Sequence, residues 1–506
     1  MTRRLLHAGF GVLATIVGVA AGHLVAALTE PAASPVLAVG STVIDLTPTP
    51  LKEWAIVHFG TNDKTLLVGS VLVGVLLLAA VAGLLTLRRF AYGAGLLVVL
   101  VAVAAAAALT RPTAGVADLL PSIAAAIAGV AALAWLVGAA AARTADGQAG
   151  GTGPSRRGVL VAGGALAAAA AVMGGAGRWI TSYRTRPENV DLPAAADPAP
   201  AFPAGLDDRV PGITPFRTPT GDFYRVDTRL TLPIVGLGDW SLTIDGDVDR
   251  EVSFSFDELA GMDLIERDIT LTCVSNDIGG RYVGGARWLG VPLKDLLDRA
   301  GIGSTGADQI LSTDVDGMTI STPLDLATDG RDAMIAIGMN GGALPQEHGF
   351  PARMVVPGLY GFISATKWIT RMTLTTYAEQ DAYWTQRNWA TDAPIKPSSR
   401  IDTPKALATI DPGRTVIGGV AWAQHRGGVT KVEVRVDGGG WQEARLGPSA
   451  GQDYWRQWYL PWTAEKGQHT LAVRAVDGHH EEQTAARATP FPNGSSGIQS
   501  IVVTVA

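Results

Sequence analysis

Cysteine is almost absent from this sequence. Its 506 residues include a single one, Cys273, which excludes a disulfide bond within the chain. A structural zinc site is disfavoured as well, because one thiol among scattered histidines gives no recognised ligand spacing. The chain also has no Cys-x-x-Cys-His segment, so it offers no site for covalently attached haem. The lone thiol is therefore either a small buried apolar group or a reactive one.

Charged side chains are scarce before residue 180. Residues 1–180 carry 11 Lys and Arg and 6 Asp and Glu, whereas residues 181–506 carry 29 and 40. The first part is built of long Ala, Val, Leu and Gly runs, and the second reads as an ordinary globular protein. The acidic balance of the second part makes it a poor binder of nucleic acid. A chain of this length is expected to hold two or more domains.

Residues 1–180 are predicted to be a transmembrane region. A helix that crosses a bilayer needs about 20 apolar residues, and five stretches qualify: roughly 5–28, 65–87, 90–110, 119–142 and 158–177. Residues 33–46 are apolar but short, and they are expected to form, together with 47–64, an extracytoplasmic loop that lies on the membrane. The partner of this part is therefore membrane lipid.

The cations that flank the five stretches predict their orientation. With a cytoplasmic N-terminus, seven arginines lie inside and four cations lie outside, as the positive-inside rule favours. The inside set is Arg3, Arg4, Arg88, Arg89, Arg143, Arg156 and Arg157, and the outside set is Lys52, Lys64, Arg111 and Arg178. Five crossings then place residues 178–506 outside the cytoplasm, as part of a multi-pass cell-membrane protein. Arg156 and Arg157 precede an Ala/Gly-rich segment and resemble a Tat signal, or else they are two cytoplasmic anchors.

The second part divides into three segments. Residues 181–222 are rich in proline and alanine, which predicts an extended, semi-rigid linker. Residues 223–395 interleave strand and helix patterns, which indicates an α+β domain. Residues 396–506 show short alternating strands broken by Gly and Asp-Gly turns, which is typical of an immunoglobulin-like β-sandwich. The predicted fold class is thus multi-domain, with five transmembrane helices, an α+β domain and a sandwich.

Cys273 follows a strand pattern and precedes a glycine-rich loop. A thiolate in that position suits a soft metal or acts as a nucleophile; the nucleophile would need a base such as His348 or His425. Further along, His348, Arg353 and Lys367 surround an apolar strand, and such cations commonly hold a phosphate. One thiolate with a phosphate-binding set points to a phosphorylated cofactor that carries a metal.

Four motifs in order resemble the sulfite oxidase family of molybdopterin enzymes. They are "LTCVSN", "GARWLGVPLKDLL", "MNGGALPQEHGFPARMVVPGLYG" and "TKW". The resemblance covers residues 220–506, and the β-rich tail resembles that family's "Mo-co dimerisation" domain. The membrane part looks like that of membrane-anchored actinobacterial relatives. The resemblance implies an extracytoplasmic molybdenum-dependent oxidoreductase that performs two-electron oxygen-atom transfer.

The resemblance also implies roles for particular residues. Cys273 would ligate molybdenum beside the dithiolene of molybdopterin, and Arg426 would face the substrate, although a surface arginine in a turn is the alternative. The residues that would bind the cofactor are Tyr224, Arg225, Asn276, His348, Arg353 and Lys367. Asn276 could equally be a turn residue. The implied partners are a small-molecule substrate, an unidentified redox partner such as a quinone or a cytochrome, and a second copy of the chain in a homodimer.

The sequence departs from the family where sulfite is bound. Cations are expected in the segment "FYRVDT" and just after the cysteine, but these places read Val226-Asp227-Thr228 and Asn276-Asp277. Carboxylates in place of cations argue against a dianionic substrate such as sulfite. The alternative function is a membrane receptor or adhesion protein that has lost its chemistry and uses the sandwich to bind a partner.

Overall fold

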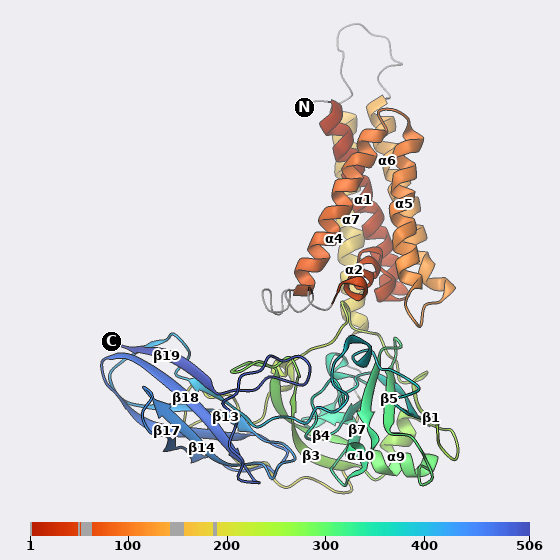
Figure 1. Cartoon of the computed structure of the whole chain (residues 1–506). Coiled ribbons are helices and arrows are strands. Elements are labelled where there is room, and N and C mark those ends of the chain that lie inside the picture. Colours follow the sequence, from red (N-terminus) through yellow and green to blue (C-terminus); the bar gives the residue numbers. More distant parts are fainter. Residues whose placement is uncertain (1–2, 49–50, 52–62, 142–155, 186–189) are drawn as a thin grey trace. The chain divides into compact units, whose positions relative to one another are not determined.

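The computed structural model describes residues 3–48, 51, 63–141, 156–185 and 190–506. The chain forms two compact units (Figure 1). The helical unit comprises Met1–Arg186 together with Thr228–Ile234, and the second unit comprises Pro187–Asp227 together with Val235–Ala506.

Among its described residues, the helical unit contains five helices that are long and apolar enough to cross a membrane, as predicted. The α-helices described in this unit are α1 (Arg3–Leu28), α2 (Pro35–Leu46), α4 (Asp63–Leu85), α5 (Phe90–Leu109), α6 (Leu120–Ala141) and α7 (Arg156–Arg184). Helix α1 is the most buried of these five helices and packs against α4, α6 and α7. Glycines permit the close crossing of α1 and α4, because a Cβ atom at Gly11 or Gly83 would collide with the backbone of the other helix.

Two parts of the helical unit differ from the prediction. Residues 35–46, expected to be part of a loop, form helix α2, because Pro35 at its first turn fixes a helical φ angle and an apolar run follows. With 12 residues, α2 is too short to span a bilayer. Helix α7 continues to Arg184 instead of ending near 177. Residues 49–50 and 52–62 of the expected loop, and Arg143, lie outside the described residues.

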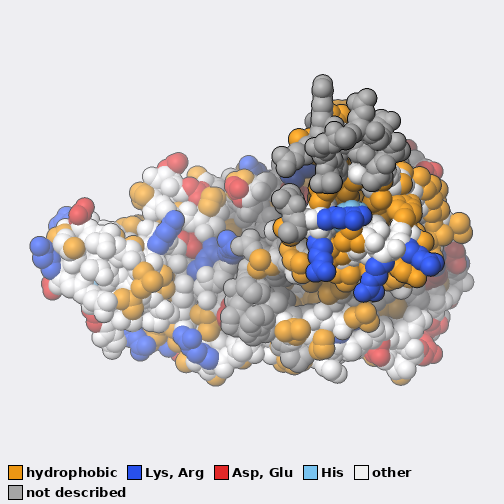
Figure 2. All heavy atoms as spheres, turned by 90° about the horizontal axis from the view of Figure 1, so that it is seen from above, with side chains coloured by type: hydrophobic (Ala, Val, Ile, Leu, Met, Phe, Trp, Pro, Cys, Tyr) orange, Lys and Arg blue, Asp and Glu red, His pale blue; other side chains and the backbone are white. Residues whose placement is uncertain are grey.

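One end of the helical unit carries a group of arginines. Arg3 and Arg4 begin α1, Arg88 and Arg89 lie between α4 and α5, and all four are exposed. Figure 2 shows Lys and Arg side chains gathered over this end of the bundle, among hydrophobic side chains. Such a charged end suits the anionic surface of a membrane leaflet.

The α+β part of the second unit is built on two sheets. One has the order β2-β1-β10-β5-β6, and the other has the order β3-β4-β7-β8, with β9 paired to β7. The strands are β1 (Ser241–Gly246), β2 (Val252–Ser255), β3 (Ile265–Thr272), β4 (Val283–Pro292), β5 (Gln309–Asp314), β6 (Thr319–Pro323), β7 (Met334–Met339), β8 (Gly342–Ala343), β9 (Arg353–Val355) and β10 (Ile369–Thr375). Short helices α8 (Phe256–Ala260), α9 (Leu293–Ala300) and α10 (Leu324–Thr328) pack on them. Strands β3 and β4 pair antiparallel up to Thr272 and Val283, which places Cys273 in the connection between them.

The C-terminal part is a two-sheet β-sandwich, as predicted. Its sheets have the orders β11-β13-β17-β16 and β12-β19-β18-β14-β15. The strands are β11 (Ser398–Thr403), β12 (Thr409–Ile410), β13 (Gly413–Trp422), β14 (Val429–Val436), β15 (Gln442–Glu443), β16 (Arg445–Leu446), β17 (Arg456–Ala464), β18 (Gly467–Asp477) and β19 (Gln499–Val505). Alternate residues such as Ile417, Val432 and Val473 fill the space between the sheets.

The Pro/Ala-rich segment, expected to be an extended linker, is anchored to the second unit by a few buried side chains. Leu206, Val210 and Ile213 are buried together against the sandwich. Phe216 lies in the main core, and its carbonyl oxygen accepts hydrogen bonds from Tyr454 and Trp455. The segment therefore ties the two parts of the second unit together, although it forms little regular secondary structure.

Candidate functional site

Cys273 lies in the turn that joins β3 to β4, and its side chain is buried. Its backbone N–H donates to the Tyr282 carbonyl oxygen at 2.9 Å, and the Ser275 N–H donates to Sγ at 3.4 Å. Burial raises the pKa of the thiol, while the Ser275 hydrogen bonds and the charge of Lys367 act in the opposite direction. No hydrogen bond joins the thiol to a histidine among the described residues, which leaves the Cys-His nucleophile without support.

The predicted phosphate-binding residues meet on one side of this turn. Arg353 begins β9 and its Nη1 donates to the His348 carbonyl oxygen at 3.2 Å. A bridge between extended backbone segments also joins Arg353 to Lys367. His348 Nε2 lies 3.0 Å from the Thr220 carbonyl oxygen, which can only accept, so Nε2 carries the proton and Nδ1 keeps its lone pair.

Two further predicted residues, Tyr224 and Arg225, come from the segment before β1. Arg225 Nε donates to Asp227 at 2.7 Å, and Lys367 Nζ donates to the same carboxylate at 3.0 Å. Tyr224 is half-buried, and its pKa is raised by burial and by the charge of Cys273. The structure thus brings together the predicted residues Tyr224, Arg225, His348, Arg353 and Lys367 beside Cys273; we refer to them, with Asp227, as the cationic cluster.

The cationic cluster holds more positive than negative charge in a buried setting. Burial lowers the pKa of Lys367 to about 8, although Asp227 partly offsets this effect. Burial likewise lowers the pKa of Arg353 to about 10, and burial together with the neighbouring Arg353 lowers the pKa of His348 to about 4. Each shift marks an unfavourable interaction that an anion bound among these side chains would relieve.

Arg353 provides the test of whether a phosphorylated cofactor fits. The residue is 5% exposed, its guanidinium lies 5.1 Å from the centre of the Trp288 ring, and its Nε has no hydrogen-bond partner. Among the described residues no carboxylate pairs with it. A buried guanidinium with a free donor suits a phosphate oxygen, and the nearby thiol suits a soft metal. The residues present therefore fit a phosphorylated cofactor with a thiolate-bound metal.

Asp227 was not recognised as a partner of the cluster from the sequence. It stood out only as a carboxylate in place of a cation, but the structure shows it bound to both Arg225 and Lys367. Residues two apart on an extended segment point to the same side, so the Arg225–Asp227 spacing could have indicated the pair. The partner lysine is 140 residues away and has no such signal.

Asn276 acts as a turn residue. It is buried, its N–H donates to the Cys273 carbonyl oxygen at 3.0 Å, and its Oδ1 accepts from the Tyr282 N–H at 2.8 Å. Its side-chain oxygen is therefore committed to the shape of the turn that carries the thiol.

Arg426 is engaged within the sandwich. Its Nε donates to the buried carboxylate of Asp477 at 2.7 Å, and its Nη2 bonds to Glu481. Its neighbour His425 faces Asp329 and Asp453 at 3.7 and 3.8 Å. The expected substrate role of Arg426 has no support in these contacts, because both carboxylates neutralise the guanidinium.

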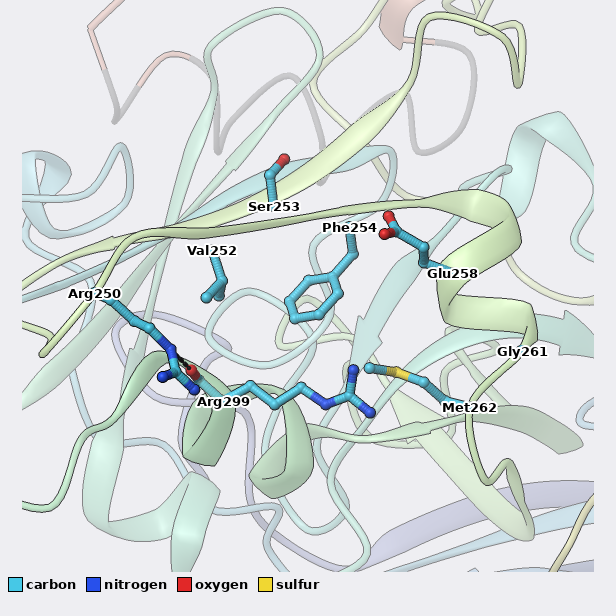
Figure 3. A pocket seen from close by; sticks show the side chains of 8 residues that line it. All are labelled: Arg250, Val252, Ser253, Phe254, Glu258, Gly261, Met262 and Arg299. Atoms are coloured by element: carbon cyan, nitrogen blue, oxygen red, sulfur yellow. Dashed lines mark hydrogen bonds between the residues drawn. The ribbon is translucent and has the colours of Figure 1, made fainter.

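A surface hollow of about 540 Å³ between β2, α8 and α9 is a weaker candidate (Figure 3). Val252 and Phe254 point toward Arg299, and Arg250 Nε donates to the Arg299 carbonyl oxygen at 2.7 Å. Glu258 caps the first turn of α8 through Ser255. The polar groups of the hollow are used within the fold, and its lining includes neither cysteine nor histidine.

His348 should make the fold sensitive to acid. Its pKa is about 4 in the fold against an ordinary 6.5, so between these pH values only the unfolded chain takes up the proton. Stability is therefore lost as pH falls through this window, by up to about 3 kcal/mol. We expect His348→Gln to flatten this loss in chain purified from molybdate-free cultures. The loss of stability is followed by the rate at which Cys273 becomes accessible to a thiol reagent in urea, measured from pH 7 to pH 4. The same dependence of this rate on pH in the wild type and in His348→Gln would contradict the assignment of the acid sensitivity to His348.

Comparisons with known proteins find a molybdopterin-binding domain in this part of the chain. Residues 229–384 match the family described as "Oxidoreductase molybdopterin binding domain", and residues 397–473 match "Bacterial Ig domain". Mitochondrial sulfite oxidase from Rattus norvegicus is 31% identical over 283 residues, which cover 46% of this chain and 51% of the rat protein. Nitrate reductase [NADH] from Spinacia oleracea is 26% identical over 303 residues, which cover 47% of this chain and 32% of that protein. The chain spans about half the length of the mitochondrial sulfite oxidases from Rattus norvegicus and Homo sapiens that it matches.

A solved structure is similar to more than half of the chain. The sulfane dehydrogenase SoxCD from Paracoccus pantotrophus aligns with a TM-score of 0.51 and 25% sequence identity, covering 58% of this chain and 84% of the other. The matched domain implies a molybdopterin cofactor with molybdenum.

Proposed function

We propose that this chain, a molybdopterin-dependent oxidoreductase of the sulfite oxidase family, catalyses two-electron oxygen-atom transfer at a molybdenum centre bound by Cys273. The observation that carries the proposal is the cationic cluster beside the thiol, of which His348 and Arg353 are buried. Arg353 alone, with its unpartnered Nε, would be a costly residue to bury without an anion to bind.

The residues divide the work between holding the metal and holding the phosphate. Cys273 would bind the metal as a thiolate, which the charge of Lys367 favours. Arg353 and Lys367 would bind the phosphate, and His348 would accept a hydrogen bond from the pterin at Nδ1. When bound, the molybdenum centre supplies the transfer of an oxygen atom coupled to two electrons.

Tyr224 would act on the substrate side of the cluster. Its pKa is raised by burial and by Cys273, so its hydroxyl keeps the proton and can donate a hydrogen bond. Its ring centre lies 6.5 Å from that of Tyr282, in an edge-to-face arrangement. The role of Tyr224 is therefore to orient a polar oxygen beside the metal.

The charge balance favours a neutral or singly charged substrate. Asp227 bonds to both Arg225 and Lys367 and offsets one of their two positive charges, which weakens the attraction of this side of the cluster for a dianionic substrate such as sulfite. We therefore propose sulfoxides, N-oxides or an uncharged sulfur compound. The relatives include proteins named for sulfite and sulfane, which supports sulfur chemistry.

The proposal is tested on the full chain, purified in detergent. Metal analysis should give about one molybdenum per chain, and the enzyme should turn over one of these substrate classes with an artificial redox dye. A chain that contains no molybdenum after expression with molybdate would instead favour a non-catalytic receptor.

The helical unit is proposed to anchor the enzyme in the cell membrane with its catalytic part outside the cytoplasm. The exposed arginines at one end of the bundle support a cytoplasmic location of that end. Export through the Tat pathway would let the cofactor be inserted before translocation, and a quinone or cytochrome would exchange the electrons. Reporter fusions at residue 506 and in the α4–α5 turn should report opposite sides of the membrane.

A further inference from the structure

The loop that follows Cys273 is held by side chains of the C-terminal sandwich. Ser495 Oγ donates to the Asn276 carbonyl oxygen at 2.7 Å, and Gln499 packs so closely on Gly279 that a Cβ atom there would collide with its amide. Arg400, on strand β11, donates from Nη1 to the Gly280 carbonyl oxygen at 2.7 Å. The sandwich therefore contacts residues 276–280 along the whole loop.

Arg400 joins three segments that are far apart in the sequence. Besides Gly280, its Nη2 donates to Thr214 Oγ1 at 2.7 Å, and its Nε donates to Asp402 at 2.6 Å. The other carboxylate oxygen of Asp402 accepts from the Thr214 N–H at 3.0 Å, which closes a ring of hydrogen bonds. The side chains of Arg400 and Asp402 are only 11% and 8% exposed. A planar guanidinium is the one side chain that can serve three acceptors in fixed directions.

The position of Gly280 is transmitted to the thiol through the backbone. Gly280 N–H donates to the Asp277 carbonyl oxygen at 2.8 Å, which closes the loop. Two residues later, Tyr282 donates its N–H to Asn276 and accepts the N–H of Cys273. A shift of the loop at Gly280 would therefore move the groups that fix the backbone of Cys273.

We propose that Arg400 is a positioning residue, which holds the loop after Cys273 in the geometry required for the thiol to bind the metal. The expected effect on metal binding by Cys273 rests on the proposed function. The hydrogen bonds of Arg400 that hold the loop are present in the chain without a cofactor. The sandwich is accordingly a working part of the site rather than a separate binding module.

The single cysteine allows a direct test. In chain purified from molybdate-free cultures, the rate at which a thiol reagent labels Cys273 reports how often the loop opens. We expect Arg400→Gln to raise this rate at least about tenfold, because a hydrogen bond from a charged donor shifts such an equilibrium by about that factor. Arg400→Lys should recover only part of the protection, since an ammonium cannot reach all three acceptors.

The matched control is Arg474→Gln. Arg474 lies in the same sandwich, is 18% exposed and pairs with Glu433 and Glu482, which both belong to the sandwich. Its variant should label at the wild-type rate. Equal labelling of Arg400→Gln and wild type, or an equal rise in both variants, would overturn the proposal.

A milder variant covers the case in which Arg400→Gln does not fold. Thr214→Val removes one acceptor of Arg400 and keeps the side-chain shape, so it should raise the labelling rate of Cys273 by a smaller factor. An unchanged rate would contradict the positioning role of Arg400. The outcome is independent of the proposed function. A chain without molybdenum but with the expected labelling would refute the enzyme, but it would still support the inference that Arg400 holds the loop after Cys273 in place.

Discussion

Replacement of Cys273 by serine should remove molybdenum from the protein and abolish its activity. Serine offers a hydroxyl in place of the thiolate, and a hard neutral oxygen is a poor ligand where a soft one is required. Mutation of the residues that hydrogen-bond to a metal's ligands typically lowers metal affinity or activity about 10–100-fold. Loss of the ligand itself should therefore reduce turnover by more than about 1000-fold. Molybdenum content and turnover of the purified full chain measure the two effects.

The same variant should keep its fold, which separates a metal ligand from a core residue. The Ser275 N–H that donates to Sγ at 3.4 Å can donate to a hydroxyl instead, and the volume lost is small. Cys273→Ala, which keeps no donor or acceptor, should lose the metal equally. If the serine variant retained full molybdenum and activity, Cys273 would not be the ligand and the site would have to be sought elsewhere.

The elements of the fold that could be predicted are those with a strong local pattern. Five apolar runs predicted the five long apolar helices found among the described residues, and the alternating strands with Asp-Gly turns predicted the sandwich. Helix α2 was missed because the prediction was based on spanning length, and its 12 residues fall short of it. The packing of Leu206, Val210 and Phe216 was missed because a few apolar residues among prolines give no periodicity.

In the candidate site, too, the sequence indicated only residues that lie close together in recognisable motifs. His348, Arg353 and Lys367 lie within 20 residues of one another in recognisable motifs, so the sequence indicated them. Asp227 and Arg400 reach their partners across 140 and 120 residues, and such pairs are set by the fold alone. The expected substrate role of Arg426 stays a prediction without structural support, because the carboxylates that engage it lie more than 50 residues further along.

Replacement of Arg353 by methionine should stabilise the cofactor-free chain and abolish cofactor binding. The guanidinium is buried, has no carboxylate partner among the described residues and leaves Nε unpaired. Burial holds its pKa near 10, below its ordinary value, which shows that the charged form is disfavoured in the fold. Methionine has a similar length without the charge, so the free energy of unfolding should rise by about 1–3 kcal/mol. The accessibility of Cys273 to a thiol reagent in urea measures the free energy of unfolding of the second unit, which contains this cysteine.

The opposite sign is expected where an arginine already has its partners. Arg267 is paired with Asp197 and Asp332 at 2.6 and 3.0 Å and is 26% exposed, so Arg267→Met should lower stability slightly, by up to about 1 kcal/mol, and leave molybdenum content unchanged. A loss of stability in Arg353→Met comparable to that in Arg267→Met would mean that Arg353 serves the fold rather than a ligand. A site built to hold an anion predicts that Arg353→Met gains stability and at the same time loses molybdenum and phosphate. The buried, unpaired charge of Arg353 destabilises the cofactor-free fold, and a bound anion relieves this cost.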